Sequence, residues 1–83
     1  MKVYALLRIK AKLGDIARLL NSYMFELTEI YYALKGMSEE LDSEQVRVSR
    51  NKILDAVEHL MKSSEALRSV LNALGEVGQY GHE

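Results

Sequence analysis

The stretch that decides the fold is LLRIKAKLGDIARLLNSYMFELTEIYYALKGM, residues 6–37. Its apolar residues recur at alternating intervals of three and four, the spacing that places them on one face of a helix. In a heptad that begins at Leu6, the a positions are all leucine and the d positions are isoleucine, tyrosine or methionine. The a residues are Leu6, Leu13, Leu20, Leu27 and Leu34, and the d residues are Ile9, Ile16, Tyr23, Ile30 and Met37. The pattern predicts one long helix.

Further apolar side chains lie beside or behind this seam: Leu7, Leu19, Met24, Phe25, Tyr31 and Tyr32. A pair of helices covers only the a and d stripe, so this helix carries more apolar surface than one partner helix can cover. Leucine at a with isoleucine at d also favours four strands in parallel coiled coils. Both observations predict a bundle of more than two helices.

A bend is expected where the seam ends. Gly36 can adopt the left-handed conformation that closes a helix, and Ser38 is a suitable N-cap for the next one. We therefore predict a single domain with a first helix over 3–35, a turn at 36–38, a second helix over 39–75 and a flexible tail over 76–83. Asp42 or Ser43 is an alternative start for the second helix.

The second helix has a weaker seam of the same four–three spacing. Its members are Val46, Arg50, Ile53, Val57, Leu60, Ser64, Leu67, Leu71 and Leu74. The short turn makes the helices antiparallel, with residue i opposite roughly 74 minus i. This register brings Glu26 and Glu29 opposite Arg50, so we expect Arg50 to pair with one of them and to fix the register.

Composition indicates how the fold is completed. The chain has 83 residues, 48% of them hydrophobic, and no cysteine. A core this small is marginal by itself. Without cysteine, disulfides and thiolate metal sites are excluded, and there are only two histidines, so of the usual remedies the composition leaves oligomerisation open. We predict an all-α protein, an antiparallel two-helix hairpin that assembles as a four-helix bundle (a dimer) or a higher helical oligomer.

Residues with catalytic or metal-binding chemistry are sparse. Asp55, Glu58 and His59 form one cluster, but the Glu-x-x-His motif of carboxylate-bridged metal bundles is missing from the sequence. No cysteine nucleophile or phosphate-binding glycine loop is present. We therefore expect no cofactor, no metal and no enzymatic activity. A site between subunits around Arg50, Glu26 and Glu29 is the enzymatic alternative.

The leading functional hypothesis is a small non-enzymatic protein–protein interaction protein, an adaptor or assembly component, that self-associates and has a further, unidentified protein partner. Phe25 and Tyr32 lie away from the seam and are the candidates for a second contact surface, because aromatic residues are enriched at interfaces. The predicted interface comprises Leu6, Ile9, Leu13, Ile16, Leu20, Tyr23, Phe25, Leu27, Ile30, Tyr31, Tyr32 and Leu34.

The distribution of charge indicates an alternative function, and the lengths of the apolar runs indicate a location. Residues 1–20 carry five basic residues and one acidic residue, whereas residues 21–45 carry six acidic residues and one basic residue. The alternative is thus a nucleic-acid-binding regulator that uses the basic end, with Lys2, Arg8, Lys10 and Lys12. No apolar run approaches the roughly 18 residues of a membrane span, and charges interrupt the N-terminal apolar stretch, so we expect a cytoplasmic protein without membrane contact.

Overall fold

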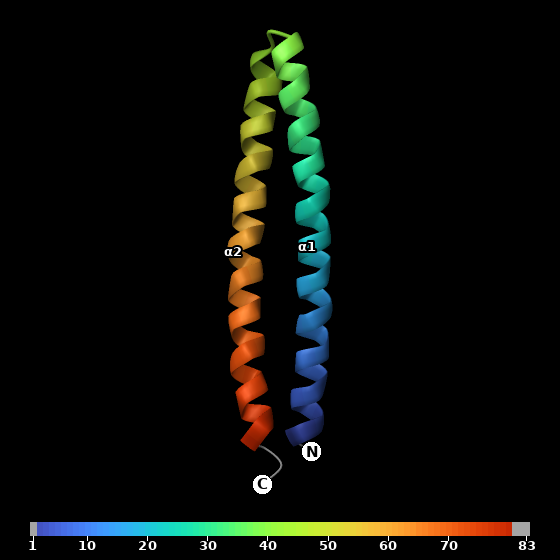
Figure 1. Ribbon diagram of the computed structural model, residues 1–83, viewed down its shortest axis with the longest axis vertical. Coiled ribbons are helices and arrows are strands. Elements are labelled where there is room, and N and C mark those ends of the chain that lie inside the picture. Colours follow the sequence, from blue (N-terminus) through green and yellow to red (C-terminus); the bar gives the residue numbers. More distant parts are fainter. Residues whose placement is uncertain (1, 81–83) are drawn as a thin grey trace.

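The computed structural model describes residues 2–80, and the side chains of residues 3–77, as two helices joined by a short link. Helix α1 comprises Lys2–Glu40 and helix α2 comprises Glu44–Tyr80. They lie side by side in opposite directions, so that the link forms one end of the molecule and the first turn of α1 lies beside the last turn of α2 at the other end (Figure 1). The all-helical hairpin expected from the sequence is confirmed.

The turn predicted at residues 36–38 is wrong, because the chain reverses at residues 41–43. Gly36 is helical, and no residue within 2–80 has a positive φ. The Ser38 hydroxyl donates a hydrogen bond back to the carbonyl of Lys35 at 2.8 Å instead of capping a new helix. A glycine inside a helix costs about 1 kcal/mol, which is too little to end a helix that contains no proline.

Helix α2 begins at the alternative start considered above. The Ser43 hydroxyl accepts a hydrogen bond from the backbone N–H of Val46 at 3.3 Å, which is the contact of an N-cap residue. The Ser43 carbonyl accepts the backbone N–H of Arg47 at 3.2 Å. At the other end, residues 76–80 continue α2, where a flexible tail over 76–83 was predicted, and residues 81–83 lie outside the described part of the chain.

Moving the turn shifts the register between the helices. Ser64 bonds to Asn21 and Arg50 bonds to Ser38 across the hairpin, so facing residues have numbers that sum to 85 and 88. The predicted sum of roughly 74 is wrong because it followed from a turn placed five residues too early. The charge pairs that this register implied are consequently not formed.

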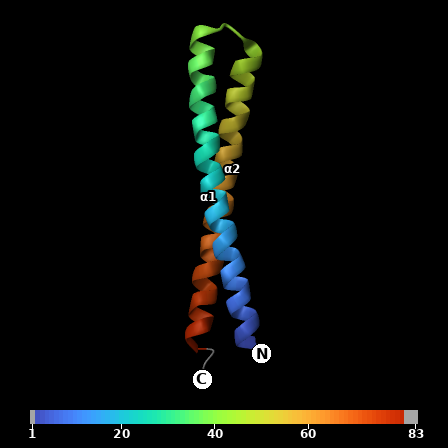
Figure 2. The same ribbon diagram turned by 90° about the vertical axis from the view of Figure 1, so that its right-hand side faces the viewer.

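The hairpin is long and thin. Its Cα atoms extend over 64 × 14 × 13 Å. The two helices cross at a shallow angle along this length, as the side view shows (Figure 2). A molecule only two helices thick has no interior, and every side chain lies near its surface.

The face that α1 presents to α2 carries only one of the two predicted seam stripes. All five leucines of the a positions are half-buried, together with Ala17, Met24 and Tyr31 four residues after three of them. In α2, all nine residues of the predicted seam are half-buried or buried. The seam of α2 was therefore predicted correctly, whereas the seam of α1 is formed by the a positions and the positions four residues later.

The contact between the helices leaves no hydrophobic side chain among residues 3–77 fully buried. Within that range Ser64, at 7% exposure, is the one buried residue. The accessible surface of the chain is 6627 Å², whereas a compact monomer of 9.4 kDa has about 5000 Å². The isolated hairpin thus exposes much more surface than a compact protein of its mass.

Candidate protein-interaction surface

The d residues of the heptad form an exposed apolar stripe along α1, which we name the outer stripe: Ile9, Ile16, Tyr23, Ile30 and Met37. Their exposed fractions lie between 44% and 52%. Four of them belong to the predicted interface residues. Because each residue follows the previous one by seven, the stripe runs straight along the helix for almost its whole length.

A shallow groove opens between the two helices beside the middle of the outer stripe. Tyr23, Leu27 and Ile30 line it from α1, Leu60 lines it from α2, and Glu26 borders it. The groove shows that the outer stripe and the seam between the helices form one continuous apolar face. A helix laid along this face would contact side chains of both α1 and α2.

The corresponding flank of α2 is built from smaller side chains. Ala56 and Ser63 lie four residues before and three residues after Leu60, so they share its side of the helix. Val70 continues the same row and is 43% exposed. Large residues on α1 beside small residues on α2 leave the groove open.

A second apolar surface lies on the opposite side of α1. Phe25 and Tyr32 are 68% and 62% exposed. Phe25 follows Tyr23 by two residues, a rotation of about 200° around the helix, so it points away from the outer stripe. The Tyr32 ring packs edge-on against the ring of Tyr31, with centroids 5.2 Å apart. We name Phe25 and Tyr32 the aromatic surface.

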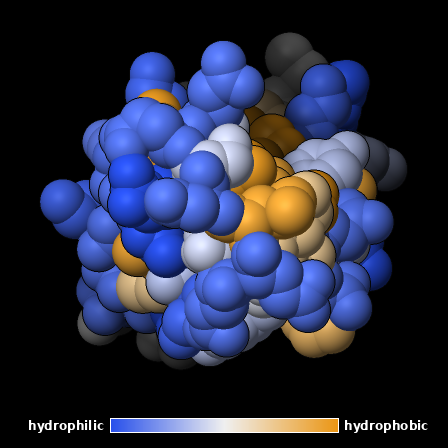
Figure 3. Space-filling view, turned by 90° about the horizontal axis from the view of Figure 1, so that it is seen from above, coloured by the Kyte–Doolittle hydropathy of each residue, from blue (hydrophilic) through white to orange (hydrophobic). Residues whose placement is uncertain are grey.

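The turn end of the molecule is also partly apolar. Seen from above, a group of hydrophobic residues lies among hydrophilic ones (Figure 3). Met37 and Leu41, in this part of the chain, are both exposed. The outer stripe therefore reaches the turn without being covered there.

The predicted interface residues thus separate into three groups. Six of them lie on the half-buried face between α1 and α2: Leu6, Leu13, Leu20, Leu27, Tyr31 and Leu34. Ile9, Ile16, Tyr23 and Ile30 belong to the outer stripe, and Phe25 and Tyr32 to the aromatic surface. The side chains of the second and third groups are at least 46% exposed in the hairpin.

Two polar contacts between described side chains join the helices. The Arg50 guanidinium donates from Nη1 to the Ser38 hydroxyl at 3.2 Å, and the Ser64 hydroxyl donates to Oδ1 of Asn21 at 3.2 Å. A shift of the register would leave the buried Ser64 hydroxyl and the half-buried Arg50 guanidinium without these partners, so the two bonds disfavour other registers. The sequence singled out Arg50 and Ser64 as polar seam residues, but their partners could not be deduced from the wrong register.

The pairing predicted for Arg50 with Glu26 or Glu29 is wrong. Ser38, to which Arg50 bonds, follows those glutamates by 12 and 9 residues, or roughly 13–18 Å along α1. The ion pairs formed by the described side chains are local: Asp15 pairs with Arg18, and Glu44 pairs with Arg47, each within one helix. Within one hairpin, Arg50 is therefore not brought together with Glu26 or Glu29.

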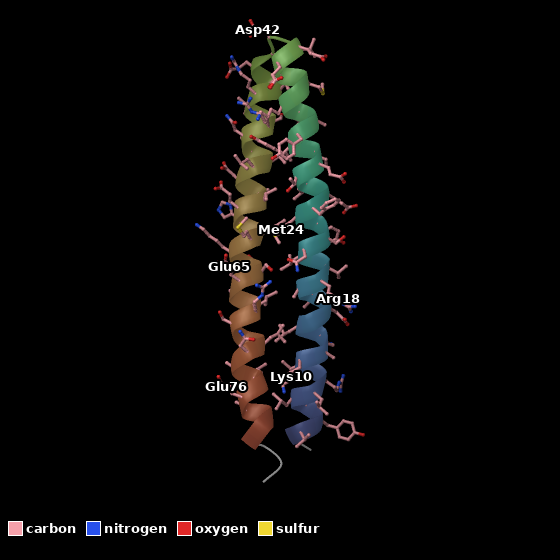
Figure 4. The ribbon with its side chains drawn as sticks, in the orientation of Figure 1. Lys10, Arg18, Met24, Asp42, Glu65 and Glu76 are labelled. Atoms are coloured by element: carbon pink, nitrogen blue, oxygen red, sulfur yellow. The ribbon has the colours of Figure 1, made fainter. Side chains whose placement is uncertain are left out.

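The basic residues of α1 whose side chains the structure describes do not form one patch, and the side chain of Lys2 lies outside the described part. Arg8 and Lys12 are exposed and border a shallow depression with Ala5 and Ile9. Lys10 is half-buried and lies between the two helices, whereas Arg18 lies on the outer side of α1 (Figure 4). Arg8 and Lys12, one turn apart, are therefore the basic pair that shares one exposed face of this end.

The histidine of the candidate metal cluster has a local contact within α2. Nδ1 of His59 lies 2.7 Å from the backbone carbonyl of Asp55, one turn earlier in α2. No group of three or more histidine or carboxylate side chains that could hold a metal ion occurs among the described residues.

From the sequence we did not identify which apolar rows of α1 form the seam and which form the outer stripe. A strict a and d repeat predicts that the a and d rows together face the partner helix. In the structure, the half-buried face instead combines the a row with Ala17, Met24 and Tyr31, each four residues after an a position. The sequence did contain a signal for two contact surfaces, because apolar residues on three adjacent rows of one helix are enough to contact two neighbouring helices. The later turn also had a signal, because Leu41 follows Leu34 by seven residues.

No protein-family model matches the chain, and neither a curated protein nor a solved structure shows significant similarity to it. In the part of the chain that the structure describes, neither helix has an apolar segment suited to crossing a membrane.

Proposed function

We propose that this protein is a small non-enzymatic interaction protein, an adaptor or assembly component of the cytoplasm, that self-associates through helix packing. The working form is a dimer in which two hairpins make a four-helix bundle. The aromatic surface, on the far side of α1, then receives a further protein partner.

The observation that carries this proposal is the outer stripe. Five large apolar residues stand half-exposed in one row, while no hydrophobic side chain described in the hairpin is fully buried. Contiguous apolar surface of this kind marks interaction sites in soluble proteins. A second hairpin on the groove face would turn the row into the interior of a bundle.

Surface area supports the same conclusion. The accessible surface of 6627 Å² exceeds the area of a compact monomer by roughly 1600 Å². Each partner in a standard protein interface contributes about 800 Å². Pairing along one face would therefore remove a large part of the excess and leave enough for another partner.

Sedimentation equilibrium of the chain at micromolar concentration tests the proposal. We expect twice the monomer mass of 9.4 kDa. We also expect a midpoint of thermal unfolding that rises with protein concentration, since association then stabilises the folded state. A folded, fully helical monomer with a concentration-independent midpoint would contradict self-association.

Matched variants locate the surface. Ile30→Glu, in the outer stripe, should convert the dimer to monomer because it places a charge in the interface. Leu54→Glu on α2 is the control: Leu54 is 39% exposed and lies one residue after the seam residue Ile53, outside the seam. Dimer mass should persist in the control. Dimer mass for both variants would exclude the outer stripe as the self-association surface.

The nucleic-acid alternative has less support from the geometry. Among the described side chains of that end, Lys10 lies between the helices, and Arg8 and Lys12 form the exposed basic pair. Two phosphate contacts give weak binding at physiological salt. Salt-dependent retention on duplex DNA or structured RNA, lost in the Arg8→Ala, Lys12→Ala double variant, would favour this alternative over a protein partner.

A further inference from the structure

The outer stripe is symmetric about its centre. Tyr23 lies in the middle, Ile16 and Ile30 lie seven residues to either side, and Ile9 and Met37 lie fourteen residues to either side. A two-fold axis at Tyr23, perpendicular to α1, therefore brings the stripe of a second chain onto the stripe of the first, side chain against side chain. Tyr23 then meets its own counterpart, and large apolar residues meet along the whole length.

Charge along α1 distinguishes this antiparallel arrangement from a parallel one. Residues 6–20 contain four basic residues and one acidic residue, a net +3, and residues 26–40 contain four acidic residues and one basic residue, a net −3. A two-fold axis at Tyr23 places these two segments opposite each other. A parallel pairing would place each segment beside its own copy, which like charges oppose.

The charged residues that border the outer stripe show the same asymmetry in the sign of their charge. Lys12 follows Ile9 by three residues, and Glu26 and Glu40 follow Tyr23 and Met37 by three, so each lies beside the stripe on the helix surface. All three are exposed. The basic border is thus at one end of the stripe and the acidic border is at its middle and other end.

The neighbouring flank of α2 allows the close approach that this pairing needs. Ala56 and Ser63, on the same side of α2 as the groove residue Leu60, are small. When α1 packs on α1 of the second chain, α2 packs on α2, and small side chains let these two backbones approach. Large side chains where α1 meets α1 and small side chains where α2 meets α2 are therefore compatible with a single four-helix bundle.

We infer that the occupant of the outer stripe is a second copy of this chain, related by a two-fold axis beside Tyr23, with the two turns at opposite ends of the bundle. The inference rests on the proposed self-association and adds its geometry. It identifies Tyr23 as the residue that contacts itself, and it pairs Ile9 of one chain with Met37 of the other.

Single-cysteine variants test this geometry directly, because the natural sequence contains no cysteine. Under mild oxidation, Tyr23→Cys should form a disulfide-linked dimer, since cysteines on the axis come within the reach of that bond. Ile9→Cys and Met37→Cys should each stay unlinked alone and form a linked dimer when the two are mixed. Phe25→Cys, on the opposite side of α1, is the control and should stay unlinked.

Far-UV circular dichroism and sedimentation of each reduced variant accompany the linking experiment. If Tyr23→Cys no longer dimerises, the mixed Ile9→Cys and Met37→Cys chains still decide, because they alter the ends of the stripe and leave its centre intact. Failure of the mixed chains to link would then overturn the inference.

Two other results would also overturn it. Linking of Ile9→Cys to itself would show parallel α1 helices, and linking of Tyr23→Cys only to Ser63→Cys of another chain would show turns at the same end. In both cases a natural chain with dimer mass would leave the proposed function standing. A monomeric natural chain would instead refute the proposed function itself.

Discussion

The two helices are nearly equal in length, 39 and 37 residues, but they differ in how many sides are apolar. Among the described side chains, eleven exposed large hydrophobic residues belong to α1 and five to α2. Five of the six aromatic residues of the chain lie in α1. Helix α2 is therefore built to pack mainly against one neighbour, whereas α1 has surface for at least two.

This difference indicates which helix carries the interactions. An amphipathic helix with one apolar row is satisfied within the hairpin, as α2 is through Ile53, Leu60 and Leu67. In α1 the leucine row is satisfied in the same way, and the outer stripe and the aromatic surface are not. Substitutions should accordingly have different consequences on the different sides of the two helices.

The largest effect is expected in the row that both helices share. Leu20→Asp places a carboxylate on the half-buried face against α2. The lost apolar contact and the unpaired charge should cost roughly 3 kcal/mol or more, which is comparable with the whole stability of a small domain. Helical content by circular dichroism and dimer mass by sedimentation should be lost together.

Leu7→Asp is the matched control for that change. Leu7 is 55% exposed and lies one residue beyond the leucine row. The same substitution there should change the free energy of unfolding by about 0.5 kcal/mol or less. A fully helical, dimeric Leu20→Asp variant would show that the leucine row does not hold the hairpin together.

A smaller loss is expected at the buried serine of α2. Ser64 occupies a seam position at which the repeat favours an apolar residue, and it is 7% exposed while its hydroxyl bonds to Asn21. Ser64→Leu should destabilise the fold by about 1–3 kcal/mol, because the larger side chain overpacks the contact. Urea unfolding measures the change, and Leu67→Met, a change of shape at similar volume, is the control. Stabilisation by Ser64→Leu would show that the contact has room.

The contrast between the helices also explains how far the sequence could be read. In α2 the seam from Val46 to Leu74 was predicted residue by residue, because a single apolar row has one interpretation. In α1 three adjacent apolar rows allowed two choices of seam, and only the position of the partner helix decides between them. The position of the turn was predicted wrongly for a different reason. Gly36 and Ser38 form a good local stop signal, but nothing forces a helix to end there when the residues beyond continue it.

A still smaller effect, of opposite sign, tests the end of α1. Gly36 is helical and exposed, and a Cβ added there would meet nothing within 4 Å. Gly36→Ala should therefore stabilise the protein by about 0.5–1 kcal/mol. Gly14→Ala, in the interior of α1 and equally free of obstruction, should give a similar gain. Destabilisation by Gly36→Ala alone would return the turn to residues 36–38, where glycine needs a left-handed conformation.

The smallest effect on stability should come from the aromatic surface, and this result separates the two exposed sides of α1. Phe25 and Tyr32 are more exposed than any member of the outer stripe, so the Phe25→Ser, Tyr32→Ser double variant loses little packing within the hairpin. Because the aromatic surface lies opposite the outer stripe, the double variant should also remain a dimer. We expect a change in unfolding free energy within about 0.5 kcal/mol per site, with helical content unchanged.

The value of this variant lies in its use as bait. Proteins that the natural chain captures from its host and the double variant does not are partners of the aromatic surface, and their loss cannot be attributed to a lost dimer. If the double variant becomes monomeric, Phe25 and Tyr32 lie in the self-association interface instead. The outer stripe would then be the free side of α1, and the roles of its two exposed faces would be exchanged.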